Sequence, residues 1–248
     1  MAVALSTTEV EAERELRVDL AAAFRLAAIF SWDDQLATHM SLRLPGAEPR
    51  FLINPYGLLF EEITASSLVV VDSEGDRLSP APQTVNKAGF VIHSAIHAAR
   101  EDARCIIHLH TVAGSAVAGQ ADGLLPLSPA AMSLWGRIGY HDFEGVTIVP
   151  EEQSRIVANL ADHLALIFRN HGTLTVGHSV GEAFNRMYML ERACQIQVAA
   201  QSSARLSIPP AKAVSLVYEQ LGSIADIPAR TWEAMLRFLD RRDTSFRD

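Results

Sequence analysis

The chain has 248 residues, of which 49% are hydrophobic and 20% charged, and its formal net charge is −8. This composition is typical of a globular protein with one large domain or two small ones, and the negative charge argues against a nucleic-acid-binding surface. No stretch approaches 18 uncharged apolar residues and the first residues lack a signal-peptide pattern, so we expect a cytoplasmic protein that does not enter a membrane.

The first hundred residues predict a helix, three strands and a second helix. A capping box of Ser6 and Glu9 marks the start of the first helix, and a Pro-Gly turn joins the first two strands. In chain order the predicted elements are Thr8–Ile29, Met40–Leu44, Arg50–Ile53, a strand within Ser66–Leu78, and Asn86–Arg100.

The remaining chain alternates strands and helices, with a second capping box at Ser179 and Glu182. The predicted elements are a strand Cys105–His110, a helix Ala113–Ala118, strands Thr147–Val149 and Leu164–Phe168, a turn and short strand within Arg169–Gly177, a helix Ser179–Ser203, and an amphipathic helix within Arg230–Asp248. Because Pro209 and Pro210 interrupt this pattern, we expect one α/β domain over residues 1–208 and a helical extension over 209–248.

Two histidines, His108 and His110, lie one residue apart in an apolar run. On a β-strand, residues i and i+2 point to the same face, so the two rings would lie side by side. Adjacent buried imidazoles repel when both are charged, but they are stable when both are neutral and share a metal ion. The pattern therefore predicts two ligands of a metal site.

A third histidine, His171, lies in a predicted turn between Asn170 and Gly172. Such a residue either caps backbone carbonyls or completes the open three-ligand arrangement of a catalytic metal, and the residue pattern alone leaves both interpretations open. His93 and His97 have the i, i+4 spacing of a helical metal site, but the glutamate of an HExxH motif is absent. We expect these two residues to be structural or to line a pocket.

Four segments together resemble the class II aldolase/adducin family: FLINPYGLLFEEITASSLVVVD (51–72), NKAGFVIHSAIHAAREDARCIIHLHTVAGSAVA (86–118), GLLPLSPAA (123–131) and FRNHGTLTVGHSVGEAF (168–184). The tail WEAMLRFLDRRDTSFRD is similar to the extension of the adducin-like branch. In the family's metal enzymes, the His-x-His pair and the later Asn-His-Gly histidine bind zinc or a related ion. The resemblance implies that His108, His110 and His171 hold one divalent metal, with zinc preferred over manganese or iron.

The resemblance also implies the fold and the assembly. The expected fold is a single α/β domain with a mainly antiparallel central sheet flanked by helices. The expected assembly is a homotetramer that binds a small-molecule substrate between neighbouring subunits.

Two parts of the family's substrate site differ in this sequence. The sugar-phosphate aldolases of the family carry Ser-Ser-Glu at the start of the helix before the histidine strand, where this chain has Lys87, Ala88 and Gly89. The Gly-Asn of their phosphate loop is matched by Thr38 and His39. The resemblance therefore implies that His39, Lys87 and Gly89 lie at the substrate, without the glutamate that serves as acid and base.

The preferred function is a divalent-metal-dependent lyase that cleaves a C–C bond of a small, oxygenated, anionic substrate. Retro-aldol cleavage needs a base for a hydroxyl proton and a metal to stabilise the enolate. Tyr140, His141 or His39 is a candidate base, and we expect Tyr140 or His141, from this or an adjacent subunit, to move the proton. Decarboxylation needs only an electron sink and a later proton donor, so both reactions stay open.

Two other functions remain as alternatives. A three-histidine site without a carboxylate neighbour leaves coordination positions for iron(II), a chelating substrate and dioxygen, as in a non-haem iron oxygenase. The missing glutamate and the adducin-like tail favour a non-catalytic, adducin-like scaffold instead. The three ligand histidines argue against a scaffold, which has no need for them.

Overall fold

The computed structural model describes residues 7–46, 48–78, 84–145, 150–202 and 205–248. Within these residues, seven strands form one sheet in the order β3-β2-β1-β4-β7-β6-β5. The strands are β1 (His39–Leu44), β2 (Arg50–Ile53), β3 (Val69–Val71), β4 (Cys105–Leu109), β5 (Ile138–His141), β6 (Ala165–Phe168) and β7 (Gly172–Gly177). All neighbouring pairs are antiparallel except β5 and β6, which confirms the expected mainly antiparallel sheet.

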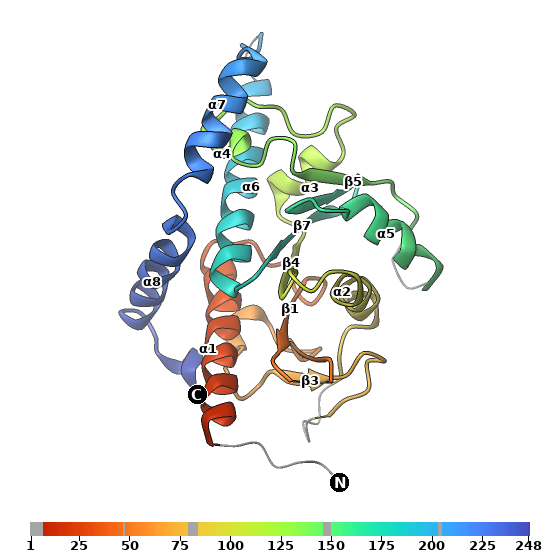
Figure 1. Cartoon of the computed structure of the whole chain (residues 1–248), viewed down its shortest axis with the longest axis vertical. Helices are drawn as coiled ribbons and strands as arrows, with labels where there is room; N and C mark the ends of the chain where they lie inside the picture. Colours follow the sequence, from red (N-terminus) through yellow and green to blue (C-terminus); the bar gives the residue numbers. More distant parts are fainter. Residues whose placement is uncertain (1–6, 47, 79–83, 146–149, 203–204) are drawn as a thin grey trace.

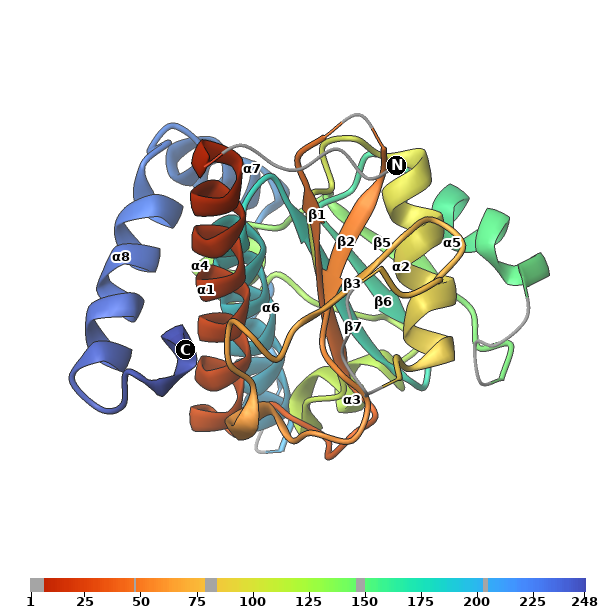
Figure 2. The ribbon, with the colours of Figure 1, turned by 90° about the horizontal axis from the view of Figure 1, so that it is seen from below.

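Helices cover both faces of the sheet (Figures 1 and 2). One face packs against α1 and α6, with α8 on the outer side of these two helices, and the other face packs against α2 and α5, as the view from below shows (Figure 2). The helices are α1 (Thr7–Ile29), α2 (Lys87–Ala99), α3 (Val112–Ala118), α4 (Pro129–Met132), α5 (Gln153–Leu160), α6 (Val180–Gln201), α7 (Ala211–Gly222) and α8 (Ile227–Asp240), with short 3-10 turns η1 (Phe60–Glu62), η2 (Pro150–Glu152) and η3 (Ser245–Arg247).

The central strand β4 is buried on both faces, so its sequence is almost continuously apolar. Ile107 packs in the core under α1 and α6, whereas Ile106 packs under α2 and α5. His108 points to the same face as Ile106, because side chains alternate along a strand. The second histidine of the sequence motif, His110, follows directly after the end of the strand.

The predicted start of the long helix α6 is confirmed. The Ser179 side chain accepts a hydrogen bond from the backbone N–H of Glu182, and the Glu182 carboxylate accepts one from the backbone N–H of His178. These bonds satisfy N–H groups that a helix leaves unpaired at its start. The other predicted capping box, Ser6 with Glu9, lies outside the described residues, as does the predicted strand Thr147–Val149.

Four elements had no residue range of their own in the sequence prediction: β5, α4, α5 and α7. Strand β5 has only four residues and pairs in parallel with β6. Neither a hairpin turn nor a long alternating pattern in the sequence therefore predicts this strand. The helices α4 and α5 have only four and eight residues, which gives a weak helical period. Helix α7 lies within the helical extension expected over 209–248.

The segment after residue 208 consists of α7, α8 and η3. Trp232 and Leu239 of α8 and Phe246 of η3 are buried in the same core as α1 and α6. Trp232 contacts the helix α6 at Gly181, where an added Cβ would lie 2.6 Å from the tryptophan side chain. Within the described chain, no helix has the length and apolar character needed to cross a membrane.

Candidate metal centre

Three imidazole rings meet at the carboxyl end of β4. The ring centroids of His108 and His110 are 4.9 Å apart, those of His108 and His171 are 4.9 Å apart, and those of His110 and His171 are 4.6 Å apart. One ligand nitrogen from each ring lies within 4.8 Å of the other two. The structure therefore brings together the three histidines that the sequence singled out.

The turn between β6 and β7 places His171 beside the other two rings. Asn170 adopts a left-handed conformation with φ of 57°, which asparagine tolerates better than most residues, and this conformation reverses the chain tightly. A Cβ at Gly172 would lie 2.5 Å from the Leu109 carbonyl oxygen and 2.8 Å from the His110 ring. Only glycine lets the turn approach β4 this closely.

Fixed hydrogen bonds orient two of the rings. Nδ1 of His108 lies 3.1 Å from the carbonyl oxygen of Thr173, and Nδ1 of His110 lies 3.1 Å from a carboxylate oxygen of Asp34. Since both oxygens only accept, each neutral ring carries its proton on Nδ1 and has a lone pair on Nε2. This outer support of ligand histidines by a carbonyl and a carboxylate is common at metal sites.

The two unprotonated nitrogens face each other. Nε2 of His108 lies 3.1 Å from Nε2 of His110, and a hydrogen bond between two neutral rings would require one of them to give up its Nδ1 partner. Two facing lone pairs at this distance repel, and a cation between them removes the repulsion. The donor set therefore fits a divalent metal held by three neutral imidazoles.

Burial keeps the rings of His108 and His171 neutral. Loss of solvation, together with the neighbouring imidazoles, lowers the pKa of His108 well below its usual value. Burial is also the main cause that lowers the pKa of His171 to about 4, with smaller effects from His110 and His141. A neutral imidazole is the form that binds a metal, so the site is prepared for a cation at neutral pH.

His39 lies directly beside the His108 ring of the cluster. It faces His108 across the β1–β4 pair, with 5.0 Å between the ring centroids. An added Cβ at Gly89 would lie 2.6 to 2.9 Å from three atoms of the His39 ring. The imidazole of His39 thus fills the space next to position 89, where the resemblance places the family's glutamate. The side chain of Lys87, at the start of α2, lies outside the described part of the chain.

Tyr140 and His141 of β5 are bonded to groups other than the three histidines. The Tyr140 hydroxyl accepts a hydrogen bond from the backbone N–H of Leu124, at 3.1 Å. Nε2 of His141 lies 3.0 Å from a carboxylate oxygen of Glu152. The ring of Phe168 contacts the rings of His141, His108 and His171, with centroid distances of 5.5, 5.3 and 5.6 Å. Within one subunit, the structure does not bring Tyr140 or His141 into the cluster.

Sequence reasoning missed Asp34 and did not connect His93 and His97 with His39. Asp34 lies 76 positions before His110 in an exposed loop, so no local pattern relates the two residues. The i, i+4 spacing of His93 and His97 was a usable signal, because β1 carries His39 and Ser41 at the matching i, i+2 spacing. These four side chains form a hydrogen-bonded row that is described below.

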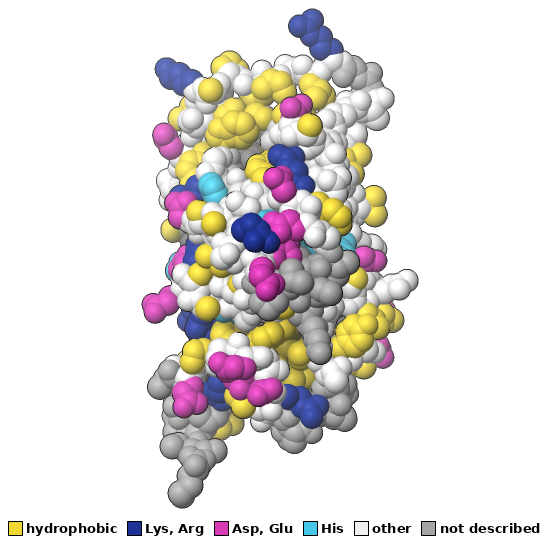
Figure 3. All heavy atoms as spheres, turned by 90° about the vertical axis from the view of Figure 1, so that its right-hand side faces the viewer, with side chains coloured by type: hydrophobic (Ala, Val, Ile, Leu, Met, Phe, Trp, Pro, Cys, Tyr) yellow, Lys and Arg dark blue, Asp and Glu magenta, His cyan; other side chains and the backbone are white. Residues whose placement is uncertain are grey.

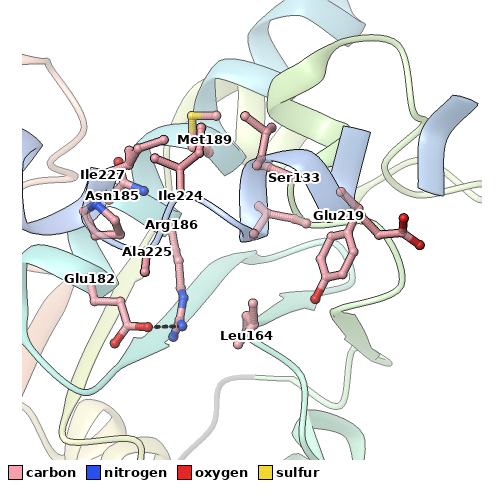
Figure 4. A pocket seen from close by; sticks show the side chains of 15 residues that line it. Ser133, Leu164, Glu182, Asn185, Arg186, Met189, Glu219, Ile224, Ala225 and Ile227 are labelled. Atoms are coloured by element: carbon pink, nitrogen blue, oxygen red, sulfur yellow. Dashed lines mark hydrogen bonds and ion pairs between the residues drawn. The ribbon is translucent and has the colours of Figure 1, made fainter. Parts of the chain in front are cut away.

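The surface has other hollows away from the three histidines. A cavity of about 360 Å³ lies between α6 and the helices α7 and α8, bordered by the Glu182–Arg186 ion pair and by Met189, Ile224 and Ile227 (Figure 4). On the side of the molecule covered by α2 and α5, acidic and basic side chains lie interspersed and little histidine surface is visible (Figure 3). None of the three clustered histidines lines the cavity at α6.

Comparison with known proteins agrees with this fold. The family model of the class II aldolase and adducin N-terminal domain matches residues 18–198. Alpha-adducin of Rattus norvegicus is 48% identical over 195 residues, which cover 77% of this chain and 26% of alpha-adducin.

Solved structures show the same architecture over nearly the whole chain. A crystal structure of an aldolase II superfamily protein from Pseudomonas syringae superimposes with a TM-score of 0.91 at 47% identity, covering 98% of both chains. L-fuculose 1-phosphate aldolase from Glaciozyma antarctica PI12 superimposes with a TM-score of 0.86 at 26% identity, covering 100% of this chain and 97% of that chain. The chain therefore belongs to the class II aldolase and adducin family.

Proposed function

We propose that the protein is a divalent-metal-dependent lyase that cleaves a C–C bond of a small, oxygenated, anionic substrate. The observation that carries this proposal is the convergence of His108, His110 and His171, with the Nε2 atoms of the first two turned toward each other at 3.1 Å. The similarity to a protein named L-fuculose 1-phosphate aldolase supports the same reaction class.

The three histidines would hold the metal, with zinc as the preferred ion. When bound, a divalent cation supplies a Lewis acid that stabilises negative charge on a substrate oxygen. Asp34 and the Thr173 carbonyl keep the ligand rings of His110 and His108 in the orientation and tautomer that metal binding needs.

His39 is the best-placed group to move a proton within one subunit. Its ring lies beside His108 and fills the space next to Gly89, so its Nε2 atom would take a proton from, or return one to, a substrate held at the cluster. Lys87 would attract the anionic part of the substrate from the start of α2. Tyr140 would act from an adjacent subunit, because its hydroxyl is bonded to Leu124 away from the cluster of its own chain. His141 is 2% exposed and both of its ring nitrogens are bonded within its own chain, so it would act only if these bonds opened.

We further propose a cytoplasmic homotetramer with the site between subunits. Exposed apolar side chains that follow two strands of the sheet support an interface: Val112, two residues after His110, is 89% exposed, and Phe143, two residues after the end of the edge strand β5, is 57% exposed. Large exposed apolar side chains commonly mark protein contacts.

Elemental analysis and a substrate screen test the lyase proposal. The purified protein is expected to hold one divalent metal per chain, and His110→Ala is expected to lose both the metal and turnover. L-fuculose 1-phosphate and a set of small 3-oxo acids separate retro-aldol cleavage from decarboxylation. A protein that turns over one of these compounds equally well after His110→Ala would exclude the proposed mechanism.

The second candidate is an adducin-like scaffold without chemistry. The 48% identity to alpha-adducin favours it, although the match covers only 26% of that protein. A scaffold needs no metal, so a fully folded preparation that binds no added Zn²⁺ would support this candidate over the lyase.

A further inference from the structure

A row of buried polar side chains runs from the candidate metal centre between β1 and α2. Nδ1 of His39 lies 2.8 Å from Nε2 of His93, and Nδ1 of His93 lies 2.5 Å from the Ser41 hydroxyl oxygen. The Ser41 hydroxyl oxygen lies 2.8 Å from Nε2 of His97, and Nδ1 of His97 lies 2.9 Å from the carbonyl oxygen of Ala103. The four side chains are at most 3% exposed, so water does not supply alternative partners.

The carbonyl at the far end fixes the direction of every hydrogen bond in the row. The Ala103 oxygen can only accept, so the neutral His97 ring has its proton on Nδ1 and accepts through Nε2. The single hydroxyl proton of Ser41 is then donated to His97, and Ser41 must accept from Nδ1 of His93. Nε2 of His93 consequently accepts from Nδ1 of His39. This arrangement leaves Nε2 of His39 without a proton.

Burial keeps the rings of His93 and His97 neutral, and the Ala103 carbonyl fixes the direction of the row. Loss of solvation is the main cause that lowers the pKa of His93 well below the usual value. Burial, followed by the positive charge of Arg43, lowers the pKa of His97 to about 3. A doubly protonated ring, which would allow the direction of the row to change, is therefore unfavourable at neutral pH.

The outer end of the row is held firmly. Phe51 stacks on the His97 ring, with 4.5 Å between the centroids and 16° between the planes. The Arg43 guanidinium donates a hydrogen bond to the backbone carbonyl of His97. These contacts fix the His97 ring against Ala103, so the orienting carbonyl bond does not depend on the metal centre.

We propose that Ser41, His93 and His97 are positioning residues that hold His39 in its Nδ1–H tautomer, with an unprotonated Nε2 beside the three-histidine cluster. In free histidine the proton lies mainly on Nε2, so the row imposes the less common form. The consequence for chemistry rests on the proposed function: only an unprotonated Nε2 can accept a proton from a substrate. The tautomer itself does not depend on that function.

Nuclear magnetic resonance of the full chain labelled with ¹⁵N-histidine tests this inference, because the nitrogen shifts distinguish protonated from unprotonated ring atoms. His39, His93 and His97 are all expected in the Nδ1–H form at neutral pH, each assigned by the loss of its signals in a single variant. An Nε2–H form at any of the three would overturn the proposal. The tautomers are read in the wild-type protein, and the variants serve only to assign its signals.

Ser41→Ala tests whether the row transmits the orientation. Without the hydroxyl, His93 has no acceptor for its Nδ1 proton, and we expect the tautomer ratio of His39 to shift roughly ten-fold toward Nε2–H. Ser41→Thr restores the hydroxyl and should restore the wild-type ratio. The matched control is Thr175→Val, which removes a buried hydroxyl on β7 that is bonded to the Ala183 carbonyl of α6 and should leave His39 unchanged.

A folded Ser41→Ala protein with an unshifted tautomer ratio at His39 would overturn the positioning role. If this variant does not fold, the tautomers of the wild-type protein test the proposal. Adding Zn²⁺ to the same samples separates the two proposals. Changes at His108, His110 and His171 report metal binding, whereas the His39 tautomer is read before metal is added. A protein that binds no Zn²⁺ but has His39, His93 and His97 in the Nδ1–H form would refute the proposed lyase function and support the proposed positioning of His39.

Discussion

The imidazole of His39 occupies the space into which a side chain at Gly89 would project, with 2.6 Å between its Cδ2 atom and an added Cβ. His39 cannot easily yield, because its ring is buried and bonded to His93. The two positions therefore depend on each other: a histidine at 39 requires the smallest residue at 89, and a glutamate at 89 would require a different residue at 39.

A double-mutant cycle measures this dependence. Gly89→Ala is expected to destabilise the protein by about 1–3 kcal/mol, since the steric conflict outweighs the gain of roughly 1 kcal/mol that alanine brings to a helix. In a His39→Ala background the conflict is absent, and Gly89→Ala should be neutral or stabilising. Urea unfolding gives the four free energies. Additive effects of the two substitutions would show that the residues do not compete for space.

Asp34 is expected to strengthen metal binding without touching the metal. Asp34→Asn weakens the acceptor for the Nδ1 proton of His110, and we expect the affinity for Zn²⁺ to fall by about 10- to 100-fold. The control is Asp33→Asn, which removes an equal charge from the neighbouring exposed residue. Competition with a chelating dye measures both affinities. Equal losses in the two variants would mean that only the overall charge matters.

Acid should destabilise the fold through the buried row of histidines. The pKa of His97 is about 3 in the folded protein, against an ordinary value of 6.5, so the unfolded chain binds the proton first as the pH falls. The full stability is present above pH 6.5 and is lost as the pH falls toward 3. His97 alone should lower the unfolding free energy by about 1.4 kcal/mol per pH unit over this range.

His97→Phe removes this proton uptake. The slope of the unfolding free energy against pH, measured between about pH 7 and about pH 5, should decrease by about one proton. The exposed His178 supplies the control, and His178→Gln should leave the slope near that of the wild type. An unchanged slope in His97→Phe would contradict the depressed pKa, whatever the change in absolute stability.

The C-terminal helix α8 is expected to contribute strongly to the stability of the main core. Trp232→Ala removes a buried ring that packs on Gly181 and Phe184 and donates a hydrogen bond to Asp19, and it should cost about 3–5 kcal/mol. The control is Trp135→Ala, because Trp135 is 41% exposed. Thermal unfolding compares the two. A loss of stability in Trp232→Ala as small as that in Trp135→Ala would indicate that α8 contributes little to the stability of the core.

Local patterns predicted most elements that have clear start and stop signals. The Pro-Gly turn predicted the hairpin of β1 and β2, and the capping box of Ser179 and Glu182 predicted the start of α6, because these signals act over a few residues. Strand β5 had no such signal, because its pairing with β6 links residues that are distant in the sequence. The parallel pairing of β5 with β6 could not be inferred from a hairpin turn, because such turns join antiparallel strands.

The candidate site was predictable only in part for the same reason. The i, i+2 spacing of His108 and His110, together with the family resemblance, led to the ligand set. The support of His110 by Asp34 could not be predicted, because it depends on how the loop after α1 folds over the sheet. The competition of His39 and a side chain at position 89 for the same space likewise could not be predicted, because it depends on the distance between β1 and α2, which no sequence pattern gives.

The polar row between β1 and α2 also restricts how this protein can evolve. Apolar side chains in such an interface can be exchanged one at a time, and a helix resting on them can slide along the strand. Each member of the row instead leaves a neighbour with an unsatisfied buried polar atom when it is lost, which is costly in a core. Drift toward an apolar interface would therefore require several simultaneous replacements, and the helix is locked in one register for as long as the row persists.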